Sequence, residues 1–255
     1  MSVQSKVVVP GVQLLPFEIG QAYVWDWGDG LTVVDSGTVG SAEAVVEAVR
    51  SMGRRPEDVT EIVLTHYHDD HRGGASELAR QTGATIVAHR VEAPVIRGER
   101  PQAPPNLTEQ ERPIAEGVLA RMMPPEPGGA AREPLSLDAL ARLLVTSSLP
   151  RVEVQREVQD GDGVGDGGLV LHIPGHTAGS IAVLVPALGV LFTGDTLASY
   201  EERMVPGVFN VDGAKMLRSI RRLAGLDFEV ACFGHGAPVV GGAAGQTRGL
   251  VETFR

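Results

Sequence analysis

The stretch "THYHDDH", residues 65–71, contains three of the seven histidines of the chain and two aspartates. It directly follows the apolar run "EIVL", which is typical of a buried strand. On an extended backbone, residues two apart point the same way, so His66 and His68 can reach one point from the end of that strand. The chain then turns and brings Asp70 and His71 nearby. Imidazole and carboxylate are ordinary ligands of zinc and neighbouring transition metals, so this stretch predicts a metal site.

Three further residues of ligand type stand at the ends of apolar strands, each beside glycine. They are His176 in "PGHTAGS", Asp195 in "VLFTGDT" and His235 in "VACFGHG". One such residue alone would be a weak signal, because a histidine next to glycine more often has a structural role. Four strand-end sites in one chain indicate that they serve a common centre.

The rest of the chain alternates short segments rich in valine and isoleucine with helical patterns, which is typical of an α/β fold. Single helices are expected at 41–53, 74–83, 213–226 and 246–255. We expect one domain over residues 1–255.

A segment at about 100–150 differs from the rest because it is rich in proline. Thr108 and Glu111 form a capping-box pattern ahead of a helix at 109–123, and Ser136 is placed to cap the helix "LDALARLLV". We expect a helical insertion, which is either a surface segment, a dimer contact or a lid over the site. As a lid, its wall would consist of Leu119, Met122, Met123, Leu140, Leu143 and Leu144.

Charge and composition restrict the partners. The 32 acidic and 22 basic residues give a formal charge of −10, which disfavours nucleic acid and an anionic membrane surface. Cys232 is the single cysteine, no run of about 18 apolar residues is present, and the first residues lack a clean signal peptide. We expect a cytoplasmic protein that acts on a small molecule, with a homodimer as an open alternative.

The motifs "THYHDDHRGG", "PGHTAGS", "TGD" and "GHG" occur in the order found in the metallo-β-lactamase superfamily, which the chain resembles over about residues 7–240. The resemblance implies an αββα sandwich. It also implies one metal on His66, His68 and His176, and a second on Asp70, His71 and His235, with Asp195 as the bridge. "VVDSG" matches another motif of the family, which gives Asp35 the role of orienting the metal loops.

Two divalent ions in such a centre would hold a bridging hydroxide for hydrolysis, with Asp70 orienting it or handling its proton. Zn²⁺ is the expected ion, with Fe or Mn as alternatives. Glyoxalase II-like thioesterases and lactonases of the family share this ligand set. The former carry a helical extension that binds glutathione, and this chain ends 20 residues after His235. We therefore expect hydrolysis of a small ester-like bond, in a lactone or thioester. The alternatives are a mononuclear iron sulfur (persulfide) dioxygenase and a β-lactam hydrolase.

Overall fold

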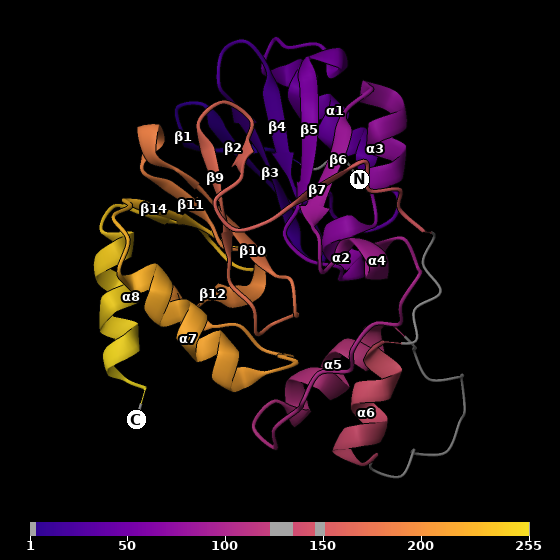
Figure 1. The fold of residues 1–255 in the computed structure, drawn as a ribbon, viewed down its shortest axis with the longest axis vertical. Helices are drawn as coiled ribbons and strands as arrows, with labels where there is room; N and C mark the ends of the chain where they lie inside the picture. The colour runs from indigo at the N-terminus through magenta and orange to yellow at the C-terminus, as the bar shows by residue number, and fades with distance from the viewer. Residues whose placement is uncertain (1–3, 123–134, 146–150, 255) are drawn as a thin grey trace.

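Two β-sheets pack face to face, and helices cover the outer face of each sheet (Figure 1). This computed structural model describes residues 4–122, 135–145 and 151–254. The four layers confirm the αββα sandwich expected from the motifs.

The first sheet has seven strands, whose spatial order follows the chain. β1 to β4 pair in antiparallel fashion, whereas β4, β5, β6 and β7 run parallel to one another. The strands are β1 (Lys6–Val9), β2 (Val12–Pro16), β3 (Gln21–Asp26), β4 (Leu31–Val34), β5 (Val59–Leu64), β6 (Thr85–His89) and β7 (Arg156–Val158).

The second sheet has six strands, of which β11 and β14 are a parallel pair. In spatial order the strands are β15 (Val239–Val240), β14 (Val230–Cys232), β11 (Val190–Phe192), β10 (Ile181–Val185), β9 (Gly168–His172) and β8 (Gly163–Val164). A separate hairpin consists of β12 (Leu197–Tyr200) and β13 (Arg203–Pro206). Because the carboxyl ends of parallel strands meet at one edge, each sheet presents neighbouring strand ends there.

Amphipathic helices pack their apolar sides on the outer faces of the sheets. α1 (Ala42–Ser51) and α3 (Ala75–Thr82) cover the first sheet, and α7 (Gly213–Ala224) and α8 (Ala243–Glu252) cover the second. Ser41 precedes α1 as expected, but its side chain makes no capping hydrogen bond. The short elements are α2 (Asp69–Arg72), α4 (Ala93–Ile96), η1 (Pro56–Asp58), η2 (Pro186–Leu188) and η3 (Gly194–Thr196).

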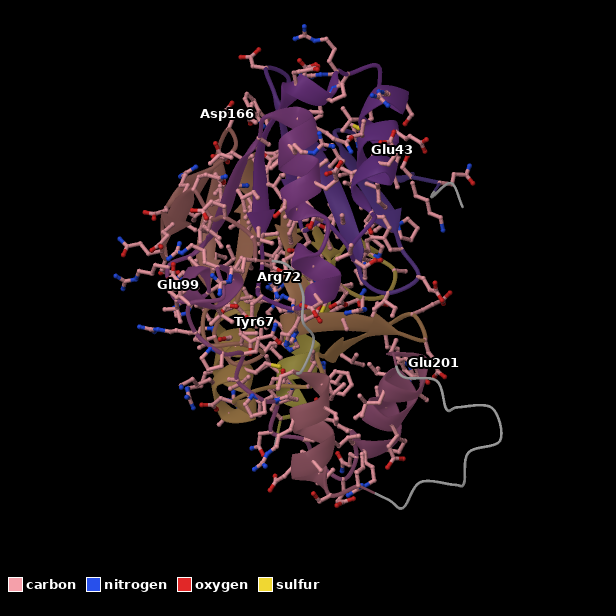
Figure 2. All side chains as sticks on the ribbon, turned by 90° about the vertical axis from the view of Figure 1, so that its right-hand side faces the viewer. Glu43, Tyr67, Arg72, Glu99, Asp166 and Glu201 are labelled. Carbon is pink, nitrogen blue, oxygen red and sulfur yellow. The ribbon has the colours of Figure 1, made fainter. Side chains whose placement is uncertain are left out.

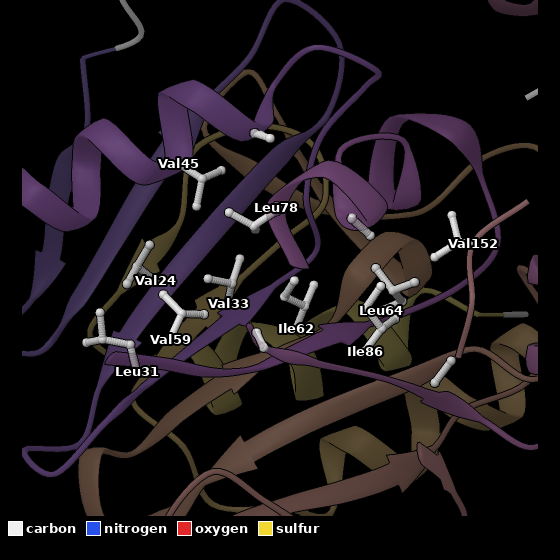
Figure 3. Close-up of a cluster of buried hydrophobic side chains, with 14 of the residues drawn as sticks. Val24, Leu31, Val33, Val45, Val59, Ile62, Leu64, Leu78, Ile86 and Val152 are labelled. Carbon is white, nitrogen blue, oxygen red and sulfur yellow. The ribbon is translucent and has the colours of Figure 1, made fainter. Parts of the chain in front are cut away.

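Three apolar cores hold the layers together. The core between the sheets includes Trp25 and Phe192, each 1% exposed. Outside the first sheet, Val45 of α1 and Leu78 of α3 point toward Ile62 of β5 (Figure 3). Burial of this apolar area on both faces of each sheet stabilises the fold and keeps the strand ends in fixed positions.

The helical insertion expected near 100–150 is present in the described residues as α5 (Arg112–Met122) and α6 (Leu137–Leu144). The predicted caps form: Thr108 N donates to Glu111 at 2.8 Å, and Ser136 Oγ accepts from Ala139 N at 3.2 Å. Figure 2 shows the two helices at one end of the molecule. α5 begins three residues after the expected start at 109, because the capping pair lies before its first turn.

The insertion has its own small apolar core between α5 and α6, formed by Leu107, Ala115, Leu119, Leu140 and Ala141. Two hydrogen bonds join the insertion to the loop after β13. Asn106 N donates to Asn210 O, and Phe209 N donates to Glu111 Oε1, each at 2.8 Å. Among the described helices, none combines the length and apolar composition needed to cross a bilayer.

The Tyr23 hydroxyl connects the first sheet to the loop after β14, and its removal tests this connection. It donates to Phe233 O at 2.8 Å and accepts from Gln21 Nε2 at 3.0 Å. We expect Tyr23→Phe to lower the free energy of unfolding by about 1 kcal/mol, the net value of one such bond. Urea denaturation of metal-free protein measures it. Tyr200→Phe is the control, because Tyr200 is 67% exposed. Equal stability of both variants would contradict the assignment.

Candidate metal centre

The seven predicted ligand residues lie together at one edge of the sandwich. His66 and His68 follow β5, and the next turn, α2, carries Asp70 and His71. The second sheet supplies the rest from the segments after β9, β11 and β14, which carry His176, Asp195 and His235. Strand ends of both sheets therefore meet at one point, as the sequence pattern predicted.

The first group, called here the three-histidine group, consists of His66, His68 and His176. His68 Nδ1 lies 3.0 Å from His66 Nε2 and 3.0 Å from His176 Nε2. Tetrahedral zinc with Zn–N bonds of about 2.0–2.1 Å separates its ligand atoms by about 3.3 Å. The spacing of these three ring nitrogens therefore fits a single ion.

The second group, called here the aspartate–histidine group, consists of Asp70, His71 and His235. Asp70 Oδ2 lies 3.2 Å from His235 Nε2 and 3.5 Å from His71 Nε2. The three donor atoms all lie within 4.8 Å of one another. A second ion therefore has three converging donor atoms.

Asp195 contacts both groups. Its Oδ2 lies 3.6 Å from His176 Nε2 and 3.2 Å from His235 Nε2, and its Oδ1 lies 3.3 Å from His71 Nε2. One carboxylate thus reaches a histidine of the three-histidine group and both histidines of the other. This is the position that a bridging ligand requires.

Buried partners orient the rings from behind. Asp35 Oδ2 lies 2.8 Å from His71 Nδ1, and the Asp35 carboxylate also accepts from Thr65 N and Thr65 Oγ1, each at 2.8 Å. Because the Thr65 hydroxyl donates to Asp35, its oxygen accepts from His66 Nδ1 at 3.0 Å. Both imidazoles therefore direct Nε2 into the centre, as a ring does when its other nitrogen is held by a hydrogen bond. The predicted orienting role of Asp35 agrees with these contacts.

His176 is oriented by Asn210, a residue that no sequence motif singles out. Asn210 Oδ1 lies 3.3 Å from His176 Nδ1, and Asn210 Nδ2 donates to Gly207 O at 2.8 Å. The donated bond fixes the amide so that its oxygen faces the ring. An asparagine 34 residues from its histidine belongs to no local pattern, so the contact appears only in the fold.

The electrostatics of the two groups differ. Burial lowers the pKa of His66 and of His176, and it lowers that of His68 to about 3, so these rings are neutral and offer lone pairs. Asp195 raises the pKa of His235 to about 10. Burial opposes a charge on His71, but Asp195, Asp70 and Asp35 together raise its pKa. In the absence of a metal, protonated histidines compensate the buried carboxylates.

Two observations show that the residues fit metal ions. Within the described part of the chain, His71 Nε2 and Asp195 Oδ1 are buried side-chain atoms that make no hydrogen bond of regular geometry, although they lie 3.3 Å apart, so both are available as ligand atoms. In addition, a Cβ at Gly234 would collide with Asp195 Oδ1 and lie 2.6 Å from His71 Cε1. Glycine at this position keeps the space around the donor atoms clear.

The remaining two histidines, His89 and His172, lie outside the cluster. His89 and His172 stack on each other with ring centroids 4.1 Å apart. Cys232 is buried in β14, and burial raises the pKa of its thiol, which agrees with an inert core residue. Tyr67 donates to Ala103 O at 3.1 Å, so it ties the centre to the start of the insertion (Figure 2). Tyr200 is exposed and does not line the cleft described next.

A cleft of about 380 Å³ opens beside Asp195 and His235. Its walls are mainly apolar and come chiefly from three segments: the turn between β2 and β3, helix α5, and the loop after β13. The apolar side chains are Phe17, Ile19, Ile114, Val118, Ala198, Val208 and Phe209. Among the described residues that line it, Glu18 is the one charged side chain outside the metal cluster.

The chain is similar to known metallo-hydrolases in sequence. The family model of the metallo-beta-lactamase superfamily matches residues 15–235. "Probable metallo-hydrolase YqjP" of Bacillus subtilis (strain 168) is 26% identical over 236 residues, which cover 88% of this chain and 70% of the relative. A hydroxyacylglutathione hydrolase of Cereibacter sphaeroides is 30% identical over 215 residues, covering 83% of this chain and 60% of that protein.

Solved structures share the fold. A metallo-beta-lactamase family protein from Thermus thermophilus superimposes with a TM-score of 0.62 at 22% identity, covering 96% of this chain and 80% of the other. BJP-1, a subclass B3 metallo-beta-lactamase of Bradyrhizobium japonicum, gives 0.63 at 18% identity, covering 98% and 91%. The match of the family model, which spans both sheets and all four strand-end motifs, identifies the chain as a member of the metallo-beta-lactamase superfamily of metal-dependent hydrolases.

Proposed function

We propose that this protein is a dinuclear metal hydrolase of small, uncharged, ester-like substrates, either lactones or thioesters. One ion is held by His66, His68 and His176, the other by Asp70, His71 and His235, and Asp195 bridges them. Zn²⁺ is the expected ion. The observation that carries the proposal is the contact of one carboxylate, Asp195, with both ligand groups beside an apolar cleft.

The chemistry requires no nucleophilic side chain. Two divalent ions bound by these residues would make hydroxide available near neutral pH and would polarise the substrate carbonyl. The protein holds the donor atoms apart at fixed distances and keeps the rings in one orientation through Asp35, Thr65 and Asn210.

Asp70 is suited to orient an attacking water at this site. Its burial raises the carboxyl pKa, but the charge of His71 and the hydrogen bond and charge of His235 outweigh burial and hold the pKa below its usual range. The carboxylate is therefore ionised at neutral pH, and Oδ2 faces His235 at 3.2 Å. An ionised oxygen at the side of the cluster can orient an attacking water by accepting its hydrogen bond.

The cleft favours an uncharged substrate with an apolar acyl group. Its walls offer apolar side chains, and its described lining contains neither lysine nor arginine. Hydroxyacylglutathione thioesters and β-lactams both carry carboxylates, which would meet Glu18 and neither lysine nor arginine in the cleft walls away from the metal cluster. This charge pattern favours acyl esters and lactones over both.

The apolar wall is built from other residues than the sequence suggested. Leu119 and Leu140 are buried in the core between α5 and α6, where Leu143 and Leu144 also pack. Met123 and the Met122 side chain lie outside the described residues. Instead, Ile114 and Val118 of α5 line the cleft. The four described leucines therefore pack the two helices together, which is the alternative to a wall, and do not line this cleft.

A substrate panel with metal analysis tests the proposed function. We expect about two zinc ions per chain, and turnover of uncharged acyl lactones and thioesters ahead of glutathione thioesters, β-lactams and phosphodiesters. Metal content is measured by plasma mass spectrometry and hydrolysis by product assay. One iron per chain with oxygen consumption would identify a persulfide dioxygenase instead. Preferential β-lactam turnover would identify a β-lactamase.

The bridge is tested by Asp195→Asn. An amide is neutral and binds metal weakly, so we expect less than two ions per chain and at least a hundredfold loss of kcat, with the fold retained. Asp69→Asn is the control, because Asp69 is the neighbour of Asp70 in sequence but pairs with Arg72 outside the cluster. Circular dichroism checks the fold. Wild-type turnover with two bound ions in the Asp195 variant would exclude the bridging role.

The wall is tested by the double variant Ile114→Ser and Val118→Ser. Each methylene of an acyl chain that loses apolar contact costs about 0.8 kcal/mol. We therefore expect kcat/KM for an eight-carbon acyl substrate to fall roughly tenfold relative to the two-carbon substrate, which does not reach the wall. Glu116→Ser, an exposed position on α5, is the control. An unchanged ratio between long and short chains would place the acyl group elsewhere.

A further inference from the structure

Glu92 is a buried carboxylate that the ligand motifs do not include. It lies just before α4 and is 1% exposed. Its own backbone is fixed in this turn, because Glu92 N donates to His89 O at 2.8 Å and Val95 N donates to Glu92 O at 2.9 Å. The side chain therefore starts from a fixed turn at the beginning of α4, outside both sheets, and extends toward the loops of the metal centre.

The two carboxylate oxygens of Glu92 accept from two different loops of the metal centre. Tyr67 N, between His66 and His68, donates to Oε2 at 2.9 Å. Gly179 N, three residues after His176, donates to Oε1 at 2.7 Å. One carboxylate thus joins the segments that carry all three members of the three-histidine group.

Glycine at position 179 permits this contact. A Cβ there would lie 2.8 Å from Glu92 Cγ and 2.9 Å from Oε1, closer than real Cβ contacts. Gly179 does not have a positive φ angle, so the need for glycine is steric rather than conformational. The loop of His176 and the carboxylate therefore fit each other closely.

A second tie between the same loops lies in the backbone. Ile181 N, at the start of β10, donates to Thr65 O at 3.0 Å. This bond holds the loops at the residue before His66, whereas Glu92 holds them at the residue after it. These two contacts lie on either side of His66, and together they fix the position of the His66–His68 loop relative to the His176 loop.

Glu92 is buried, so the hydrogen bonds to its carboxylate are needed to offset the free-energy cost of burying it. Burial raises the pKa of Glu92 to about 7, although the hydrogen bonds from Gly179 N and Tyr67 N lower it. A carboxylate that is so costly to bury is retained where its two oxygens each satisfy a separate buried N–H group.

We propose that Glu92 is a positioning residue of the metal centre: by joining the His66–His68 loop to the His176 loop, it sets the spacing of the three ring nitrogens that receive the first ion. This inference rests on the proposed metal binding by these histidines. Glu92 touches neither ion nor substrate, and it acts through the backbone at Tyr67 and Gly179.

The test compares Co²⁺ binding by metal-free wild-type protein, Glu92→Gln and Gly179→Ala. Glutamine can accept at one oxygen only, so one loop loses its acceptor. The alanine methyl displaces the carboxylate while keeping its charge. Absorption spectra of Co²⁺, in competition with a chromophoric chelator, give the affinity of each site. His68→Ala and His235→Ala assign the bands to the two sites.

We expect both variants to weaken Co²⁺ binding at the three-histidine site about tenfold, as loss of an orienting partner does, and to leave the other site within about threefold. Glu61→Gln is the matched control. Glu61 also accepts from a backbone amide, Gly165 N at 2.7 Å, but on β5, before the metal loops. This variant should leave both Co²⁺ affinities unchanged even if its thermal stability falls.

Three outcomes would overturn the inference. Wild-type affinity of the three-histidine site in both variants would show that Glu92 does not set its spacing. Equal weakening of both sites, in step with a lower melting temperature of the metal-free protein, would assign it a general structural role. Failure of wild-type protein itself to bind Co²⁺ would refute the proposed metal function together with the inference. Should Glu92→Gln not fold, Gly179→Ala decides among these outcomes.

Discussion

The constraint on which the centre depends is the burial of the Asp195 carboxylate among histidines of both sheets. An ionised carboxylate removed from water must be compensated by positive charge or by strong donors. Here His71 lies 3.3 Å and His235 lies 3.2 Å from its oxygens, and both rings carry raised pKa values. In a loaded centre the compensating charge would come from divalent ions, whose binding requires these rings to lose their protons. Metal binding would therefore offset the free-energy cost of removing the Asp195 carboxylate from water.

The sandwich makes this concentration of charge feasible because it fixes the donors on rigid strand ends. β4 and β5 in one sheet, and β11 and β14 in the other, end at the same edge and deliver Asp35, the 66–71 segment, Asp195 and His235. The ligand histidines form hydrogen bonds through their second ring nitrogen with groups that do not face the substrate, among them Thr65 and Asn210. Most of the precision of the centre thus comes from hydrogen bonds between its loops, and Glu92 extends this arrangement to the loop of His176.

The residues of the cleft walls come from other parts of the fold than the donor atoms of the metal cluster. The donor atoms come from the two sheets, whereas the cleft walls come from a hairpin turn, the loop after β13 and α5 of the insertion. Asn106 and Glu111 of the insertion form hydrogen bonds with that loop. These bonds hold the apolar side of α5 in position beside the cleft. Because the insertion carries its own small core, its cleft-facing residues can change without disturbing the metal cluster.

The sequence by itself indicated the residues of the cluster, because strand-end histidines and aspartates beside glycine carry a strong local pattern, and the order of these motifs indicated the αββα sandwich through the resemblance to the family. It also determined the caps of the insertion helices, which depend on residues three apart. Only the tertiary structure decided which leucines of the insertion pack inward and which side chains line the cleft, since both depend on how α5 and α6 meet. The same holds for Asn210 and Glu92. Asn210 lies 34 residues from His176, and Glu92 lies 25 residues from Tyr67 and 87 from Gly179, and contacts over such separations are set by packing rather than by any local pattern.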